Sequence, residues 1–205
     1  MNTNEQKNIR VLVVVDAQED FIRMSLGSAD AQAVVPNIVD LINNADGKFD
    51  YIVTTQDTHP IDYLSTKEGL MLPVNHCIAG TKGWEIIPEI LQAINKFNTG
   101  DPNDDSCNIN VIKHGWGSIK NGTDEDLPTV IQRLMDENNA VNAEITLVGF
   151  DTDVCVISNT LVLKSYFYNS ADIYVDASCC AGITPQKHQH ALDVMESCLC
   201  HVINK

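Results

Sequence analysis

Short runs of apolar, often β-branched residues alternate along the chain with longer stretches in which apolar residues recur at helical spacing. The first run, RVLVVV at residues 10–15, is almost uninterrupted, which is typical of a strand buried on both faces. The pattern predicts strands at residues 10–15, 51–55, 110–113, 145–150, 172–177 and 198–203, and helices at residues 34–44, 84–97, 124–139, 152–168 and 185–197.

This alternation is the pattern of βαβ units with a parallel sheet. We therefore predict an α/β fold of three layers, a doubly wound, mostly parallel sheet of about six strands with helices on both faces. The 205 residues suit one domain, and neither a linker nor a repeat divides them, so residues 1–205 are expected to form a single domain. Residues 56–81 form a long irregular stretch, and such loops in compact domains are usually functional.

Composition and charge exclude several classes of protein. The formal net charge of −15 repels phosphate backbones and anionic lipids, so we expect neither a nucleic-acid nor a membrane partner. The polar first ten residues are no secretory signal, and the cysteine count of seven is odd, so we predict reduced thiols and a cytoplasmic location. No glycine-rich phosphate-binding motif follows a predicted strand, so we expect no nucleotide cofactor.

Four chemically capable residues, Asp16, Asp57, Lys113 and Cys155, each fall at or just after the end of a predicted strand. Ligands of a doubly wound sheet bind beyond the carboxyl ends of its strands, so these residues are predicted to share one site. Cys155 follows a strand within the first turns of a helix, where backbone N–H groups and the helix dipole favour a thiolate. A buried structural cysteine is the alternative, and most of the other six cysteines are interpreted in that way.

The partners of Cys155 would complete a nucleophilic site. A cation such as Lys113 lowers the pKa of a neighbouring thiol, and a carboxylate such as Asp16 can take and return its proton. Taken separately, Asp16 could equally be a turn residue and Lys113 a solvated strand-end residue. Together the three predict a cysteine hydrolase that acts on a small C–N substrate.

A second group of polar residues lies in the long stretch after the second strand. Asp57 and His59, two residues apart on an extended segment, point to the same side, and His76 could complete a carboxylate–imidazole site for zinc, iron or manganese. Glu68 lies between them and could add a fourth ligand. The alternative is an ordinary polar loop. The histidines of the last predicted helix, His188 and His190, are interpreted as solvated surface residues.

The motifs together resemble the isochorismatase-like cysteine hydrolases, and among them the nicotinamidase-like branch. The resemblance rests on several motifs in the same order, each near the end of a strand, and runs from about residue 11 to the C-terminus. These motifs are VDAQEDF at residues 15–21, DTHP at 57–60, HCIAGT at 76–81, the single Lys113, and GFDTDVC at 149–155.

The resemblance assigns roles to the residues that match these motifs. It implies a catalytic triad of Asp16, Lys113 and Cys155. It also implies a cis peptide bond between Phe150 and Asp151, with the main-chain N–H groups of Asp151 and Cys155 forming the oxyanion hole.

The remaining implied roles concern binding. Phe21 would line the substrate pocket, and Asp57, His59 and His76 would hold a divalent metal ion, with Glu68 near the place of a glutamate in some members. The implied activity is hydrolysis of a small amide through a thioester acyl-enzyme, with nicotinamide to nicotinate plus ammonia as the first expectation. The resemblance also implies a homo-oligomer.

Three departures from the branch leave alternatives open. Thr58 and Leu72 stand where nicotinamidases usually carry tryptophan, and Asp151 replaces a small residue. The substrate could therefore be another small amide, carbamoyl or ureido compound. A catalytically idle binding module of the same fold, and a metal-storage or redox protein, are the alternatives from other classes.

Overall fold

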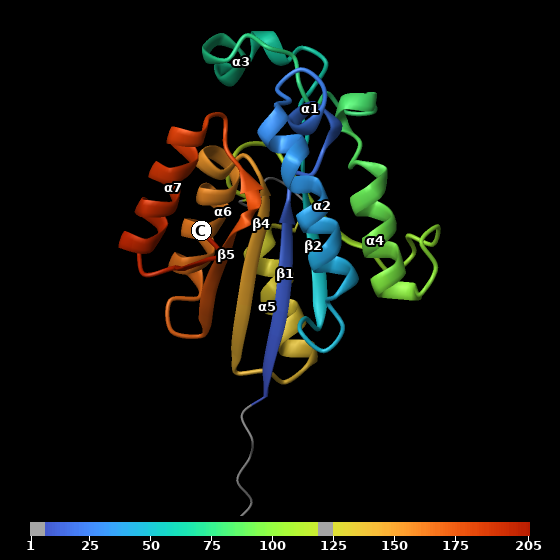
Figure 1. Cartoon of the computed structure of the whole chain (residues 1–205), viewed down its shortest axis with the longest axis vertical. Coiled ribbons are helices and arrows are strands. Elements are labelled where there is room, and N and C mark those ends of the chain that lie inside the picture. Colours follow the sequence, from blue (N-terminus) through green and yellow to red (C-terminus); the bar gives the residue numbers. More distant parts are fainter. Residues whose placement is uncertain (1–6, 119–124) are drawn as a thin grey trace, which may run out of the picture.

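Within residues 7–118 and 125–205, which this computed structural model describes, six strands form one parallel sheet in the order β3-β2-β1-β4-β5-β6 (Figure 1). The strands are β1 (Asn8–Val15), β2 (Tyr51–Asp57), β3 (Ile109–Lys113), β4 (Asn142–Phe150), β5 (Ala171–Ala181) and β6 (His201–Ile203). All five pairings are parallel, and the prediction of a doubly wound sheet is confirmed.

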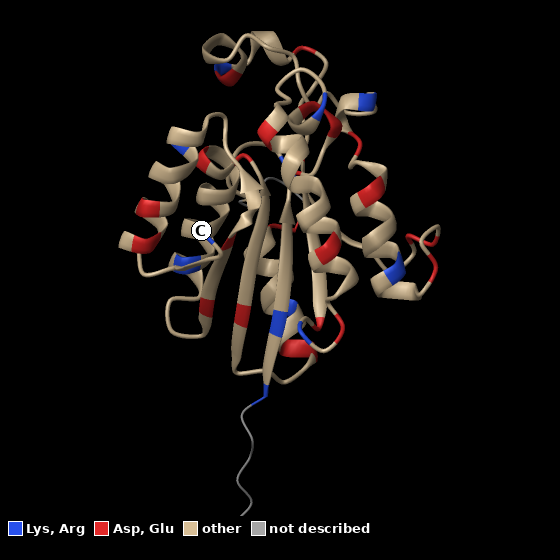
Figure 2. Cartoon of the chain, in the orientation of Figure 1, with Lys and Arg blue, Asp and Glu red and all other residues tan. Residues whose placement is uncertain are grey.

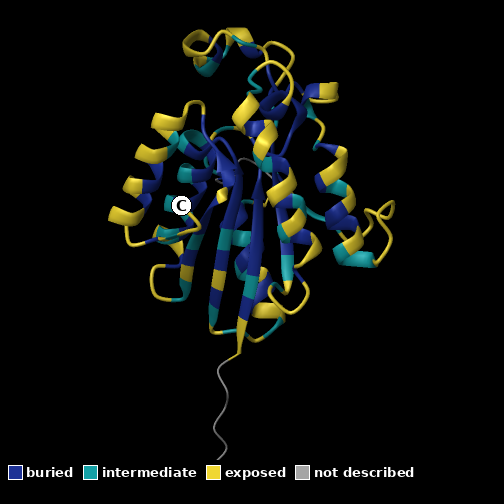
Figure 3. Cartoon of the chain, in the orientation of Figure 1, coloured by how far each residue is buried: buried dark blue, intermediate teal, exposed yellow. Residues whose placement is uncertain are grey.

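The apolar run of β1 places this strand at the centre of the sheet. Val11 pairs in register with Tyr51 of β2 on one side and with Ile145 of β4 on the other. Val11 and Val13 face one hydrophobic core and Leu12 faces the other, because successive side chains of a strand point to opposite faces. The strands are buried while the outer faces of the helices are exposed (Figure 3).

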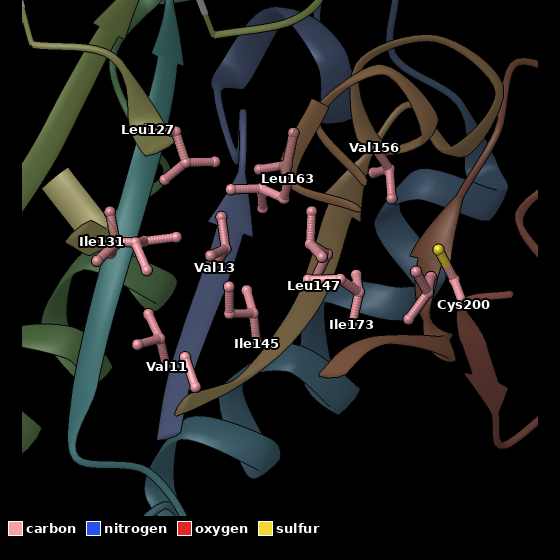
Figure 4. Close-up of a cluster of buried hydrophobic side chains, with 14 of the residues drawn as sticks. Val11, Val13, Leu127, Ile131, Ile145, Leu147, Val156, Leu163, Ile173 and Cys200 are labelled. Atoms are coloured by element: carbon pink, nitrogen blue, oxygen red, sulfur yellow. The ribbon is translucent and has the colours of Figure 1, made fainter. Parts of the chain in front are cut away.

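The helices form the two outer layers. Helices α1 (Glu19–Ile22), α2 (Ala29–Asn43) and α4 (Pro88–Thr99) contribute to the core on one face. Helices α5 (Leu127–Glu137), α6 (Ile157–Tyr166) and α7 (Pro185–Ser197) contribute to the core on the other. Figure 4 shows this second core, where Leu127 and Ile131 of α5 and Leu163 of α6 lie over the strands.

Several boundaries differ from the prediction for local physical reasons. Helix α2 starts at residue 29 rather than 34 because Ser28 caps it, accepting a hydrogen bond from the N–H of Ala31. The sixth strand starts at residue 201 rather than 198, because a turn through Leu199, at φ 63°, separates it from α7. Asp124, the expected start of the helix at residues 124–139, lies outside the described residues.

The long stretch after β2 carries short helices that the sequence did not reveal. These are η1 (Tyr63–Ser65), α3 (Lys67–Met71) and η2 (Lys82–Trp84). Helix α3 projects from the end of the sheet at which the strands terminate (Figure 1). It is one turn long and is capped by Thr66, which accepts from the N–H of Gly69, so its place depends on contacts rather than on helix propensity.

Two expectations about surface residues need correction. His188 is half-buried, not solvated, because its Nδ1 lies 2.8 Å from Thr152 Oγ1, whereas His190 is exposed as expected. Cys107 and Cys198 are exposed rather than buried, since both lie in turns outside the sheet. Among the described residues, no helix is both long and apolar enough to cross a membrane.

Candidate active site

The carboxyl ends of β1, β2 and β3 bring three charged residues together. Asp16 follows β1 with a left-handed φ of 46°. Its N–H donates to the carbonyl oxygen of Thr55 at 3.2 Å, and Thr55 Oγ1 donates to Asp16 Oδ1 at 2.7 Å. These contacts leave Oδ2 of Asp16 to face Lys113, whose Nζ lies 2.7 Å away.

Lys113 is the centre of the candidate triad. Besides Asp16, its Nζ lies 3.2 Å from Asp57 Oδ1 and 3.5 Å from Cys155 Sγ, and it donates to the carbonyl oxygen of Gly115 at 2.7 Å. Lys113, Asp16, Asp57 and Cys155 are each at most 3% exposed. A buried charge requires compensation, and two carboxylates supply it here.

Burial and these contacts shift the ionisation of each group. Although burial favours the neutral amine, Asp16, Cys155 and Asp57 together raise the pKa of Lys113 well above its usual value. Burial raises the pKa of Asp16, against the opposing effect of Lys113. Burial also raises the pKa of Cys155, and the charges of Asp16 and Asp57 add to that effect.

The shift at Cys155 corrects the expectation of a resting thiolate. Lys113 does favour the thiolate, but its charge is already matched by two carboxylates, so desolvation of the sulfur dominates. Burial therefore favours the neutral thiol of Cys155 over its thiolate. A carboxylate whose pKa is raised is a stronger base, which suits Asp16 to remove the proton when substrate binds.

Cys155 is positioned by a turn that follows β4 directly. The peptide bond between Phe150 and Asp151 is cis, at the position that the family resemblance implied. Residues Thr152–Val156 then form a π-helical turn, in which the N–H of Val156 donates to the carbonyl oxygen of Asp151 at 3.0 Å. Gly149, at φ 119°, lets β4 approach β1, because a Cβ there would lie 2.1 Å from Val15 O.

A second cluster, of one carboxylate and two imidazoles, adjoins the first through Asp57. His59 Nε2 lies 2.8 Å from Asp57 Oδ2, and His76 Nε2 lies 3.7 Å from the same oxygen. One potential ligand atom from each of the three residues lies within 4.8 Å of the others, and all three residues are buried. Asp57 has its pKa lowered to about 2, since Lys113 and His59 outweigh the effect of burial.

These atoms fit a divalent metal ion. His59 Nε2 is buried and makes no hydrogen bond of acceptable geometry, although Asp57 is close. His76 Nδ1 lies 2.9 Å from Val74 O, so a proton on that nitrogen would leave Nε2 as a metal ligand. Two imidazoles and a carboxylate are a common ligand set for zinc and iron.

Glu68 of α3 lies at the outer edge of this cluster. Its Oε1 is 3.6 Å from His59 Nε2 and 4.0 Å from His76 Nε2, and its side chain is 23% exposed. It does not belong to the compact group of three. The structure thus brings Glu68 near both histidines but outside the compact group of three.

Aromatic side chains enclose the two histidines. The ring of Tyr63 contacts both, with centroids 4.6 Å from His59 and 4.9 Å from His76, while the two histidine rings lie 4.7 Å apart. The Tyr63 hydroxyl donates to Leu72 O. Phe21, the expected pocket residue, is buried and meets His76 edge to face at 5.7 Å. Tyr63 was not predicted as a site residue, because the sequence shows it only as an aromatic residue within a polar loop.

Gln18 and Asp20 also escaped the sequence-based prediction. The Gln18 side chain accepts from the N–H of Asp57 at 2.8 Å and donates to the carbonyl of Asp57 at 2.9 Å, so it fixes this residue's backbone. Asp20 Oδ2 accepts from the N–H of Cys77, next to His76, at 2.8 Å. Both are buried polar residues within the five positions that follow the buried strand β1, and this place in the sequence was the available signal.

A tryptophan from another segment lies beside Thr58, one of the two positions where nicotinamidases usually carry tryptophan. Trp84 Nε1 donates to Thr58 Oγ1 at 2.8 Å, so an indole from η2 adjoins the residue after Asp57. Leu72, the other departure, is 38% exposed. Trp84 of η2 therefore lies next to the segment that carries the metal-ligand candidates Asp57 and His59.

Comparison with known proteins shows the family to which the chain belongs. A family model described as the isochorismatase domain matches residues 10–205. The nicotinamidase of Schizosaccharomyces pombe is 24% identical over 218 residues, covering 95% of this chain and 92% of that protein.

Solved structures give the same picture of the fold. The nicotinamidase/pyrazinamidase of Bacillus subtilis superposes with a TM-score of 0.74 at 22% identity, covering 96% of this chain and 100% of that one. The pyrazinamidase of Pyrococcus horikoshii in complex with zinc has a TM-score of 0.69 at 20% identity, covering 96% of this chain and 99% of that one. The N-carbamoylsarcosine amidase of Thermoplasma acidophilum has a TM-score of 0.65 at 21% identity, covering 95% of each chain. The chain belongs to the isochorismatase family.

Proposed function

We propose that this chain is a cysteine hydrolase that cleaves a small amide through a thioester on Cys155. The observation that carries the proposal is the position of Lys113 Nζ, in contact with Asp16 at 2.7 Å, Asp57 at 3.2 Å and the Cys155 sulfur at 3.5 Å. Family membership and the nicotinamidase relative support hydrolysis of an amide C–N bond.

In the first half-reaction Asp16 takes the proton of the Cys155 thiol. The sulfur attacks the amide carbon, while the main-chain N–H groups of Asp151 and Cys155 hold the oxygen of the tetrahedral intermediate. Asp16 then gives the proton to the leaving nitrogen, ammonia departs, and a thioester remains. Lys113 keeps its charge throughout and offsets the negative charge that develops on the sulfur.

In the second half-reaction Asp16 removes a proton from water. The hydroxide attacks the thioester carbon, the same oxyanion hole holds the intermediate, and the thiolate leaves with the proton returned by Asp16. The products are a carboxylic acid and free Cys155. The raised pKa of Asp16 favours both proton transfers, because the carboxylate can accept a proton at moderate cost.

Asp57, His59 and His76 would hold a divalent metal ion, with Glu68 reaching it directly or through water. The grouping of these buried donor atoms, with His59 Nε2 2.8 Å from Asp57 Oδ2, supports this assignment, as does the zinc in the similar pyrazinamidase. A bound ion would supply a Lewis-acidic anchor for a donor atom of the substrate. Phe21 packs on His76 and would form the adjoining apolar wall.

Nicotinamide is the first candidate substrate, since its ring nitrogen can bind such an ion while its amide reaches Cys155. A small carbamoyl or ureido compound is the second, favoured by the changed residues Thr58, Leu72 and Asp151 and by the structural similarity to N-carbamoylsarcosine amidase.

Ammonia release should be measured on a panel containing nicotinamide, pyrazinamide, an aliphatic amide and a ureido compound, with and without added zinc, iron or manganese. The proposal predicts turnover of at least one compound. Turnover of none, by a folded and metal-supplemented protein, would remove it.

A further inference from the structure

Asn159 is a fully buried amide in the first turn of α6, and the proposed mechanism gives it no part. It lies four residues beyond Cys155 and is 0% exposed. Its Nδ2 donates to the carbonyl oxygen of Cys155 at 2.9 Å and to that of Trp116 at 3.1 Å. Its Oδ1 accepts from the N–H of Ser118 at 2.8 Å. One side chain thus joins the turn of the nucleophile to a loop that precedes it by 41 to 43 residues.

The loop that Asn159 reaches directly follows Lys113, the cation of the candidate triad. Lys113 Nζ donates to the carbonyl oxygen of Gly115 at 2.7 Å and lies 3.5 Å from Cys155 Sγ. Ser118, at the far end of this loop, is 1% exposed, so its contact with Asn159 lies inside the protein. The nucleophile and the lysine are therefore joined twice, directly through Sγ and Nζ and indirectly through the buried amide.

The polar side chains on either side of Asn159 make a simpler contact. Ser158 Oγ donates to the carbonyl oxygen of Val154 at 2.6 Å, and Thr160 Oγ1 donates to that of Val156 at 2.7 Å. Hydroxyl groups in helices commonly bond to the carbonyl four residues earlier, and such a bond stays within one stretch of chain. Asn159 makes the same contact, with the carbonyl of the nucleophile, and in addition reaches the loop.

An amide at this place is unfavourable unless its hydrogen bonds are made. Asparagine is a poor helix former, because its side chain competes for backbone groups, and burial of an unpaired amide destabilises a fold. Asn159 uses both N–H donors and its oxygen, so these costs are offset. An apolar side chain could fill the same space without forming a link. The amide therefore indicates that the link itself is required.

We propose that Asn159 is a positioning residue, which fixes the turn of Cys155 against the loop of Lys113 and so keeps the sulfur in contact with the ammonium group. The inference rests on the proposed function, because it assigns Asn159 a role in the reaction of Cys155. Asn159 acts through the main chain of the nucleophile. Misplacing a reacting group by about 1 Å can cost about a hundredfold in rate, so loss of the link should affect turnover more than substrate binding.

Two variants separate the link to the loop from the contact within the helix. Asn159→Leu fills a similar volume and removes both. Asn159→Thr keeps a hydroxyl that can bond to the carbonyl of Cys155, as Thr160 does to that of Val156, but it is too short to join the loop as well. Thr160→Val is the matched control, because it removes a 0% exposed hydroxyl from the same helix and leaves the link intact.

The first readout is turnover of the best amide of the panel. In both Asn159 variants kcat should fall at least about tenfold, with KM changed less than about threefold. Thr160→Val should keep kcat within about threefold of the parent. A kcat like that of the parent in Asn159→Thr, a loss that appears in KM alone, or an equal loss in Thr160→Val would overturn the inference.

The second readout needs no turnover and separates local loosening from general unfolding. Iodoacetamide labelling with peptide mapping compares Cys155 with Cys180, which is 3% exposed on β5. The Asn159 variants should label Cys155 at least about threefold faster than the parent and Cys180 no faster, because only the turn is released.

Unchanged labelling of Cys155, or an equal rise at both cysteines, would overturn the role of Asn159. A parent protein that turns over no amide would instead count against the proposed function, and the labelling would still decide whether Asn159 holds the turn.

Discussion

The two halves of the candidate site are held in place by different means. Asp16 and Lys113 lie at strand ends, and Cys155 lies in a turn that follows β4 directly, so the sheet itself brings them together. Of the metal-ligand candidates, only Asp57 ends a strand, whereas His59, Glu68 and His76 lie on the long connection after β2. That connection is organised by individual contacts from Gln18, Asp20 and Tyr63.

The difference suggests a division of labour. We propose that the triad half, held by the sheet, is the reaction centre and that the metal half, held by a loop, orients the substrate. Asp57 belongs to both, since one oxygen faces Lys113 and the other faces His59. Figure 2 shows that most charged residues of the chain lie on helices and loops, with a few on the strands.

The largest effect is expected from Cys155→Ala, which removes the nucleophile of the triad half. Turnover should fall by roughly three orders of magnitude or more, because no covalent intermediate can form. Circular dichroism should show an unchanged fold. Activity within about tenfold of the parent would contradict the role of Cys155.

Lys113→Met tests whether the triad half is also a structural unit. Removing the cation leaves Asp16 and Asp57 buried without their counterion, and breaking a buried pair commonly costs about 3–5 kcal/mol. Urea denaturation should show a loss of free energy of unfolding of that order. Lys82→Met is the control, since Lys82 pairs with Glu85 on the surface and its loss should hardly change stability.

His59→Ala tests the metal half in isolation. The parent should contain close to one zinc, iron or manganese ion per chain by elemental analysis, and the variant should lose it, because an incomplete ligand set binds weakly. Turnover of a metal-anchored substrate should drop by at least about tenfold. The melting temperature should fall little, because the sheet does not need the ion to fold.

His190→Ala serves as the control for that variant, since His190 is exposed on α7. A parent protein that hydrolyses an amide but stays metal-free after supplementation with all three metals would remove the metal assignment. The triad assignment would be unaffected.

The smallest effect concerns the reactivity of the resting thiols. Burial raises the pKa of Cys155, so brief treatment with iodoacetamide near neutral pH should label the exposed Cys107 and Cys198 first. Peptide mapping by mass spectrometry measures the order. Preferential labelling of Cys155 would show that Lys113 outweighs desolvation and that the resting site holds a thiolate.

The sequence predicted the sheet well because its signals are local. Uninterrupted apolar runs such as residues 10–15 identify buried strands, and alternation with helices then limits the topology. Asp16, Lys113 and Cys155 could be grouped because each adjoins a strand end. That grouping needed no knowledge of side-chain contacts.

The contacts between loops could not be predicted in this way. Tyr63 of η1 packs against both histidines, and Trp84 meets Thr58 from a segment 26 residues away. Such pairs leave no periodic pattern in the sequence. The raised pKa of Cys155 was also missed, because it follows from a balance of burial against three charges rather than from the neighbouring sequence.

The most direct test of the account is detection of the acyl-enzyme itself. The parent should be mixed with its best amide, quenched with acid during turnover, and examined by mass spectrometry of the intact chain and its peptides. We predict an added mass equal to the acyl group, on the peptide that carries Cys155, and no adduct with Cys155→Ala. An acyl group on another residue, or continued turnover by Cys155→Ala, would contradict the proposal that Cys155 is the nucleophile.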